Sequence, residues 1–219
     1  MQYSNIATVS LNQAATIVES LIPHKVRPVF LWGAFGVGKS SIVQSIVASL
    51  SEQTGKQWGL IDVRASQLDA VDTRGIPDLV DGRTAFALPD WLPRVDRDGE
   101  QGILFTDELL LGSASVQASL YQLINDRQLG DYVLPSGWRI IAASNRSCDG
   151  AGVHGRQDAA LMTRFSVQLN VVPDVDEWVN FAGSAGYAPE VIAFIANRGK
   201  PVLKGNGSID QAGLLHEYP

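Results

Sequence analysis

Residues 33–40 read Gly-Ala-Phe-Gly-Val-Gly-Lys-Ser and fit the phosphate-binding pattern Gly-x4-Gly-Lys-Ser/Thr. A short apolar run at 29–32 precedes them and predicts a strand, and apolar residues recur at helical spacing from Ser40 to about Gln53. Such a loop requires a strand on one side and a helix on the other. This context favours a nucleotide site over a glycine-rich turn that binds nothing.

The residue types in this loop suit contact with phosphate. Glycine lets backbone N–H groups approach phosphate oxygens closely, and the following helix adds the positive end of its dipole. We expect Lys39 to reach the β- and γ-phosphates and the Ser40 hydroxyl to ligate Mg²⁺.

A second apolar strand, at 102–106, ends in two carboxylates, Asp107 and Glu108. An acidic pair after a strand is commonly only solvated, but parallel sheets place their chemistry at this end of the strand. After a phosphate-binding loop we therefore expect Asp107 to hold Mg²⁺, directly or through water, and Glu108 to orient and polarise the attacking water. The predicted metal ligands are Ser40 and Asp107. The predicted nucleotide contacts are Gly33, Ala34, Phe35, Gly36, Val37, Gly38, Lys39, Ser40, Ser41 and Asp107.

The composition is that of an ordinary globular protein. With 219 residues, 45% of them apolar and 18% charged, the chain is long enough for one α/β domain and a small appendage. A net charge of −6 provides no global basic field for nucleic acid. The single cysteine, Cys148, and three scattered histidines predict neither a disulfide framework nor a metal cluster. No signal-peptide pattern and no apolar run near the ~18 residues of a membrane span are present, so we expect a cytoplasmic protein.

Further elements follow from periodicity and turn residues. Residues 64–97 show no regular pattern, but apolar residues recur along them. These residues favour an ordered insertion over a surface loop that has no role. A strand at 138–142 runs into Asn145, and a short helix at 159–165 carries Arg164. The remaining predicted elements are a helix at 11–22, a strand at 58–63, a helix at 113–128, a strand at 131–134 followed by a turn, a strand at 167–172, and helices at 178–181 and 189–197.

In this order of motifs the chain resembles the AAA+ ATPases, and among them the MoxR-like branch, particularly its short phage and bacterial members. The resemblance covers about residues 8–200. Its most specific runs are Gly-Ile-Leu-Phe-Thr-Asp-Glu at 102–108, Ser-Val-Gln-Ala-Ser-Leu-Tyr-Gln-Leu-Ile at 115–124, Leu-Gly-Asp-Tyr-Val-Leu-Pro-Ser-Gly-Trp at 129–138 and Ile-Ala-Ala-Ser-Asn-Arg at 141–146.

The resemblance implies an α/β fold, in which the parallel sheet of a P-loop NTPase core lies between helices and a partial small helical lid follows. It implies a core at 1–173, a helix-2-type insertion at 72–95, a hairpin before sensor 1 at 130–138, and a partial or truncated lid at 174–219. Family lids carry a sensor 2 arginine, and no residue of this chain matches its position.

The resemblance also assigns roles to single residues. Residues 33–40 match Walker A, Asp107 and Glu108 match Walker B, Asn145 matches sensor 1, and Arg164 matches the arginine finger that one subunit inserts into its neighbour's site. Arg156 and Arg146 are alternatives for the finger. The catalytic residues implied are Lys39, Glu108, Asn145 and Arg164.

The function implied is that of an ATP-hydrolysing, Mg²⁺-dependent chaperone that remodels a protein client from a homo-oligomeric ring of six subunits. A nucleotide-gated scaffold with little turnover is the alternative. A GTP-directed or small-molecule P-loop enzyme is a third reading, and the absence of an Asn-Lys-x-Asp motif disfavours GTP.

Overall fold

The computed structural model describes residues 6–24, 28–146, 162–198, 202–203 and 209–210. At its centre lies a six-stranded sheet in which every neighbouring pair is parallel. In spatial order the strands are β1 (Ala7–Val9), β10 (Val167–Val171), β2 (Val29–Trp32), β9 (Gly137–Ser144), β6 (Gln101–Asp107) and β3 (Gly59–Arg64).

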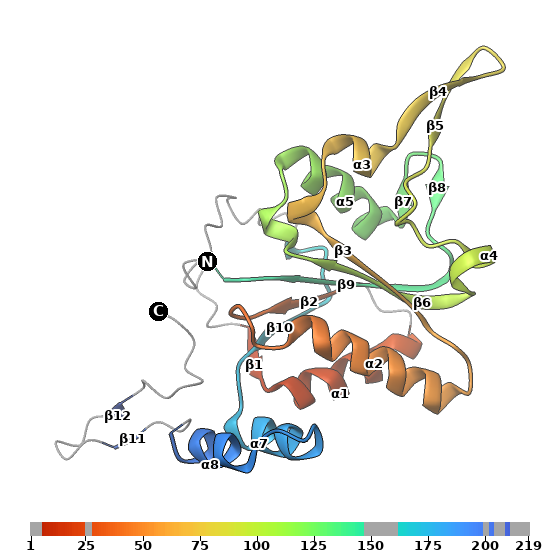
Figure 1. The fold of residues 1–219 in the computed structure, drawn as a ribbon. Helices are drawn as coiled ribbons and strands as arrows, with labels where there is room; N and C mark the ends of the chain where they lie inside the picture. The colour runs from red at the N-terminus through yellow and green to blue at the C-terminus, as the bar shows by residue number, and fades with distance from the viewer. Residues whose placement is uncertain (1–5, 25–27, 147–161, 199–201, 204–208, 211–219) are drawn as a thin grey trace.

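Helices cover both faces of this sheet (Figure 1). On one face lie α1 (Leu11–Leu21) and α2 (Lys39–Thr54), and on the other lie α3 (Ala70–Arg74) and α5 (Ala114–Asp126). The predicted α/β fold, a parallel sheet between two helical layers, is confirmed. Short 3-10 turns at Ile22–His24, Ala65–Gln67 and Leu109–Leu111 complete this part of the chain.

The central strands read as continuous apolar runs because both of their faces are covered. In β2, Val29 and Leu31 pack in the core beneath α1 and α2, while Phe30 and Trp32 pack in the core beneath α5. All four side chains are buried. The sheet therefore separates two hydrophobic cores, and the loop after Trp32 emerges at the carboxyl edge of the strands.

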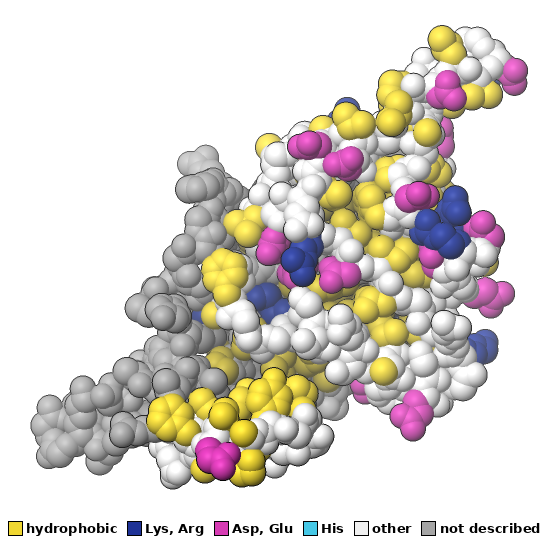
Figure 2. Space-filling model, in the orientation of Figure 1, with side chains coloured by type: hydrophobic (Ala, Val, Ile, Leu, Met, Phe, Trp, Pro, Cys, Tyr) yellow, Lys and Arg dark blue, Asp and Glu magenta, His cyan; other side chains and the backbone are white. Residues whose placement is uncertain are grey.

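Residues 64–97 form an ordered insertion. They contain α3, a hairpin of β4 (Ile76–Val80) and β5 (Arg83–Ala87), and most of the short helix α4 (Val95–Asp98). Asp81 and Gly82 both have positive φ, as a two-residue hairpin turn requires. The apolar side chains on this hairpin are exposed rather than buried, 76% for Leu79 and 50% for Phe86. Figures 1 and 2 show the hairpin projecting from the body with hydrophobic groups along it.

A short hairpin precedes β9. The strand predicted at 131–134 is β8 (Tyr132–Val133), which pairs with β7 (Gln128–Leu129). The tight turn between them, at 130–131, includes Gly130 with φ 57°. The segment after β8 leads Gly137 into the main sheet beside Gln101.

Two helices, α7 (Val175–Ser184) and α8 (Pro189–Arg198), follow the sheet, and α7 is tied to the start of α1. The Glu177 carboxylate accepts hydrogen bonds from the Ser10 hydroxyl and, at 3.1 Å, from the Asn12 backbone N–H. Trp178 and Tyr187 pack edge to face between the helices, and further apolar groups are exposed there (Figure 2). Two short strands, β11 (Val202–Leu203) and β12 (Ile209–Asp210), pair beyond α8. In the described ranges, no helix is long and apolar enough to cross a membrane.

Candidate nucleotide-binding site

The loop at 33–40 joins β2 to α2 at the carboxyl edge of the sheet. Gly38 has φ 102°, a left-handed conformation that glycine adopts without strain, and it precedes the first residue of α2. At Gly33 a Cβ atom would lie 2.8 Å from the backbone oxygen of Val171, so only glycine fits. Ala34 and Val37 are buried, whereas Phe35 and Ser41 are exposed. The loop path thus depends on residues from both β2 and β10.

Lys39 lies at the centre of the site and is buried. Its ammonium donates to the backbone oxygens of Gly33 at 2.8 Å and Ala34 at 2.9 Å, and to Oδ1 of Asn145 at 2.9 Å. An ammonium only donates, so the Asn145 amide turns its oxygen towards Lys39. Asn145 follows β9 and is itself buried, which means that the fold brings the predicted Walker A lysine and sensor 1 asparagine into direct contact.

Ser40 and Asp107 form a second contact at the same edge. The Ser40 hydroxyl donates to Oδ2 of Asp107 at 2.9 Å, and the other oxygen of this carboxylate accepts the Glu108 backbone N–H at 2.8 Å. A hydroxyl and a carboxylate are the hard oxygen ligands that Mg²⁺ takes in proteins. The donor set therefore fits the predicted cation.

Glu108 has a left-handed backbone, with φ 54° and ψ 33°. Its side-chain oxygen Oε2 accepts a hydrogen bond from the hydroxyl of Ser66, which follows β3. Sequence reasoning did not single out Ser66, because one serine in an irregular segment is not distinguished by type or spacing. The carboxylate proposed to act on water is thus held by a residue from the 3-10 turn that follows the neighbouring strand β3.

The end of β3 adds charged groups to which the sequence analysis gave no role. Arg64 is paired in register with Asp107, and Asp62 lies two residues earlier on β3. Burial raises the pKa of Asp62, the nearby Asp107 and Glu108 carboxylates raise it further, and Arg64 partly offsets them. Among the described residues no cluster of three His, Cys, Asp or Glu side chains could hold a metal, so a cation here would draw ligands from substrate or water.

The candidates for the arginine finger lie in different places. Arg146 is buried, and its guanidinium donates to Oδ1 of Asn170 at 3.1 Å, which ties it to β10. Arg156 lies outside the described residues. Arg164 lies in a turn before β10, between the buried Met162 and Phe165.

The position of Arg164 follows from the register of the strands around it. The Ser166 N–H donates to the Pro28 oxygen at 3.1 Å, and Phe165 packs edge to face on Phe30. Since β10 runs parallel to β2, Arg164 is at the amino edge of the sheet, opposite the loop at 33–40. Of the short helix predicted at 159–165, residues 159–161 lie outside the described ranges.

Comparison with known families gives one match, and it covers most of the described core. Residues 28–165 match the family described as AAA domain (dynein-related subfamily). These residues run from the start of β2 to the turn that carries Arg164. No curated protein matches the chain in sequence.

Solved structures share the fold at low sequence identity. NtrX from Brucella abortus is 20% identical with a TM-score of 0.51, and the match covers 87% of this chain and 45% of NtrX. The RuvB Holliday junction branch migration motor of Thermotoga maritima is 20% identical with a TM-score of 0.55, covering 86% of this chain and 55% of RuvB. The chain therefore spans about half the length of these structures.

Proposed function

Because the chain belongs to the dynein-related subfamily of AAA domains, which are nucleotide-binding ATPase domains, we propose that it binds and hydrolyses ATP with Mg²⁺ as a MoxR-like remodeller of a protein client. The observation that carries this proposal is the contact of Lys39 with Asn145, beside the contact of Ser40 with Asp107. Each pair joins residues far apart in sequence, and each supplies groups of the kind that phosphoryl transfer needs at one edge of the sheet.

Lys39 and the loop backbone are the groups that would bind the phosphates. The ammonium is already held over the loop by two carbonyl oxygens, so its side chain loses little freedom when phosphate oxygens replace those acceptors. Because the Asn145 amide uses its oxygen for Lys39, its nitrogen can donate to a phosphate oxygen or to the attacking water. Lys39 would thus bind the ground state, while Asn145 orients the reacting atoms.

Ser40 and Asp107 are the residues that would hold Mg²⁺, directly or through water. When bound, the ion would neutralise charge on the β- and γ-phosphates. Glu108, fixed next to Asp107, would accept a proton from the attacking water, and general-base catalysis of this kind contributes about 10²–10⁴ in rate.

We further propose that the protein works as a ring of identical subunits, six in the MoxR-like assemblies it resembles. Arg164 supports this, because its place at the edge opposite its own loop suits action on a neighbour's nucleotide. Residues 1–173 would be the ATPase core and 174–219 the lid, of which α7 and α8 form part. The hairpin β4–β5, with Leu79 and Phe86 exposed, is the surface we assign to the protein client.

A nucleotide-gated scaffold with little turnover is the second candidate, and one observation favours it. The Glu108 carboxylate already accepts a hydrogen bond from Ser66. The oxygen held by Ser66 is not free to accept a proton from the attacking water, which would keep hydrolysis slow until the bond opens.

Steady-state phosphate release, measured over a range of protein concentrations, tests the proposal. We expect Mg²⁺-dependent turnover that rises per subunit as the ring assembles, and loss of tight ATP binding in Lys39→Ala, because no backbone amide replaces the ammonium. Lys56→Ala, an exposed lysine beyond α2, is the matched control and should behave like the unmodified chain. Tight Mg²⁺-ATP binding by Lys39→Ala would refute the site, whereas tight binding with negligible turnover at every concentration would favour the scaffold.

A further inference from the structure

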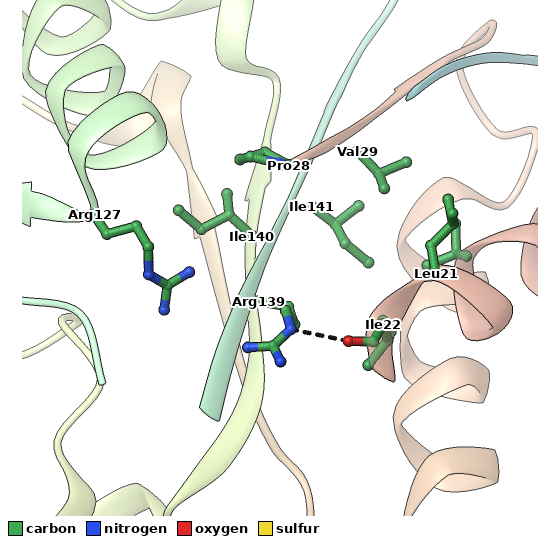
Figure 3. Close-up of a pocket in the computed structure, with 9 residues that line it drawn as sticks. Leu21, Ile22, Pro28, Val29, Arg127, Arg139, Ile140 and Ile141 are labelled. Atoms are coloured by element: carbon green, nitrogen blue, oxygen red, sulfur yellow. Dashed lines mark hydrogen bonds between the residues drawn. The ribbon is translucent and has the colours of Figure 1, made fainter. Parts of the chain in front are cut away.

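Two arginines lie side by side at the amino edge of the sheet, away from the nucleotide loop (Figure 3). Arg127 ends α5, and Arg139 lies near the start of β9. Both donate to the same acceptor, the backbone oxygen of Trp138, at 2.9 Å from Arg127 and 3.2 Å from Arg139. The shared acceptor holds the two guanidinium groups next to one another, and Figure 3 shows their heads directed into the same space.

No carboxylate neutralises this pair among the described residues. The three ion pairs there all involve Arg94 or Arg97 instead. The nearby Tyr132 hydroxyl donates to the Pro93 oxygen, and burial raises its pKa to about 12, so it stays uncharged at neutral pH. Within the part of the chain that the structure describes, two positive charges therefore face each other without a counter-charge.

Several N–H donors of the pair have no acceptor within the described structure. Arg127 uses only Nη2, which bonds the Pro135 and Trp138 oxygens, leaving Nε and Nη1. Arg139 uses Nε and Nη1, the former to the Ile22 oxygen at 3.1 Å, leaving Nη2. The bonds that are made position the side chains, and the remaining donors are available for a ligand.

The backbone of Arg127 has a left-handed conformation, which is unusual for a residue with a side chain. Its φ is 57°, at a helix end where glycine or asparagine is the usual residue. A long cationic side chain is kept there despite the cost of the left-handed conformation and of a like charge alongside. Strained positions of this kind are concentrated at functional sites.

We propose that Arg127 and Arg139 form a binding site for a phosphate group, separate from the nucleotide loop. Two guanidinium groups match the charge of a phosphate dianion, whereas one carboxylate would leave a net positive charge, and arginine suits phosphate through paired N–H donors. The hollow beside them is small, about 20 Å³, which is far too little for a nucleotide. Along β9 the pair is about 20 Å from Asn145, at ~3.3 Å per residue, so one phosphate cannot contact both sites.

The experiment is an NMR titration of the full chain with inorganic phosphate at constant ionic strength, following arginine Nε–H signals. The nucleotide loop is filled with a non-hydrolysable ATP analogue and Mg²⁺, and a second series uses Lys39→Ala to disable the loop without nucleotide. Arg127→Lys and Arg139→Lys assign the two signals, because each removes one of them. We expect both signals to shift together with one saturation curve, in both series.

Arg139→Gln should weaken phosphate binding about tenfold or more, the effect expected for losing a hydrogen bond between charged groups. Arg127→Lys and Arg139→Lys keep the charge but lose the paired donors, and should also weaken it. Arg83→Gln, on the exposed hairpin, should leave the affinity unchanged. Melting temperatures without phosphate separate lost binding from lost folding.

Two comparisons complete the test. Acetate should compete poorly, because it carries a single charge. A phosphate monoester that binds as well as inorganic phosphate would identify the ligand as a group on a larger molecule, and weaker binding of the monoester would identify the free ion. Absence of a saturable shift, or equal affinity in folded Arg139→Gln, would overturn the proposal.

Discussion

Glu108 has an unfavourable backbone conformation at the point where the proposed chemistry occurs. A left-handed residue with a side chain costs about 1–2 kcal/mol relative to the right-handed form, and Glu108 adopts it directly after β6. Bonds from its N–H to Asp107 and from the Ser66 hydroxyl to its carboxylate hold it there. The conformation turns the chain away from the strand and leaves Glu108 beside Asp107.

Glu108→Gln should keep ATP affinity and reduce turnover by about 10²–10⁴, because the amide keeps the shape but cannot accept a proton from water. Nucleotide binding measured by calorimetry and phosphate release measured at saturating ATP separate the two effects. The variant should also accumulate as an ATP-loaded assembly. Unchanged turnover would assign the base to another residue.

Ser66→Ala should raise basal turnover, because it frees a Glu108 carboxylate oxygen from its hydrogen bond, so that this oxygen can accept a proton from the attacking water. The check is kcat at saturating ATP. Ser45→Ala, whose hydroxyl bonds only a helix carbonyl on α2, is the matched control. A fall in kcat with unchanged KM would show instead that Ser66 positions Glu108 productively.

Among the elements, the end of β3 concentrates negative charge beside the proposed cation site. Asp62, Asp107 and Glu108 interact, and the pKa of Asp62 is raised, first by burial and then by the other two carboxylates. A raised pKa for an acid means that the folded chain binds the proton more tightly than the unfolded chain does. Stability linked to Asp62 is therefore present at low pH and is lost as pH rises through its folded-state pKa.

Asp62→Asn should accordingly raise the melting temperature at pH 7, and the gain should shrink below the ordinary pKa of an aspartate, where Asp62 is protonated in both states. The gain should be small, because the Asp62 carboxylate is only partly desolvated and the residue is otherwise accessible to solvent, which screens its charge. Melting curves across pH 3–8 in EDTA measure it, with Glu52→Gln on the exposed face of α2 as control. Mg²⁺ should reduce the difference between variant and parent, since a cation relieves the same repulsion. A gain that is equally large at pH 3 would contradict this account.

At the scale of the whole molecule, the arrangement of β10 and β2 separates Arg164 from its own nucleotide loop. The two strands are parallel, so the turn before β10 and the loop after β2 lie at opposite edges of the sheet. An arginine at this position suits action on a nucleotide bound to another subunit, where an arginine finger raises the rate of hydrolysis by about 10³–10⁵. Buried neighbours, Met162 and Phe165, fix the turn that carries it.

Arg164→Ala should bind ATP normally and hydrolyse it poorly. Mixing it with Glu108→Gln is the sharper test, because a Glu108→Gln subunit still supplies an arginine to an Arg164→Ala neighbour whose own Glu108 is intact. Mixed assemblies should therefore regain phosphate release, most strongly at ratios that maximise mixed interfaces. If both variants co-assemble and no activity returns, Arg164 does not act in trans.

The local features of the site could be read from the sequence. The loop at 33–40 is recognisable because its backbone conformation requires glycine at fixed positions. Gly38 does adopt the left-handed conformation. The strand before it and the helix after it were predicted to within a residue or two, because burial on both faces and helical periodicity leave direct patterns. Asp107 and Glu108 were predicted for the same reason, since the end of a strand is visible in the sequence itself.

The tertiary structure alone decided which of these residues meet. Lys39 contacts Asn145, 106 positions away, because β9 lies next to β2 in the sheet, and no local pattern encodes that order. The same holds for the hydrogen bond from Ser66 to Glu108 and for the pairing of β7 with β8, neither of which a local pattern indicated.

The tertiary structure alone also decided which apolar side chains are exposed and which charges lack a partner of opposite sign among the described residues. The sequence marked Leu79 and Phe86 as apolar, but only the projection of the hairpin leaves them exposed. It likewise contains Arg127 and Arg139, but only the approach of α5 to the start of β9 places them together without a carboxylate. The conformational preferences of single residues and the periodicity of apolar residues act over short stretches, so they can be read from the sequence. Contacts between distant segments depend on strand order and on how the layers pack, which are properties of the folded molecule as a whole.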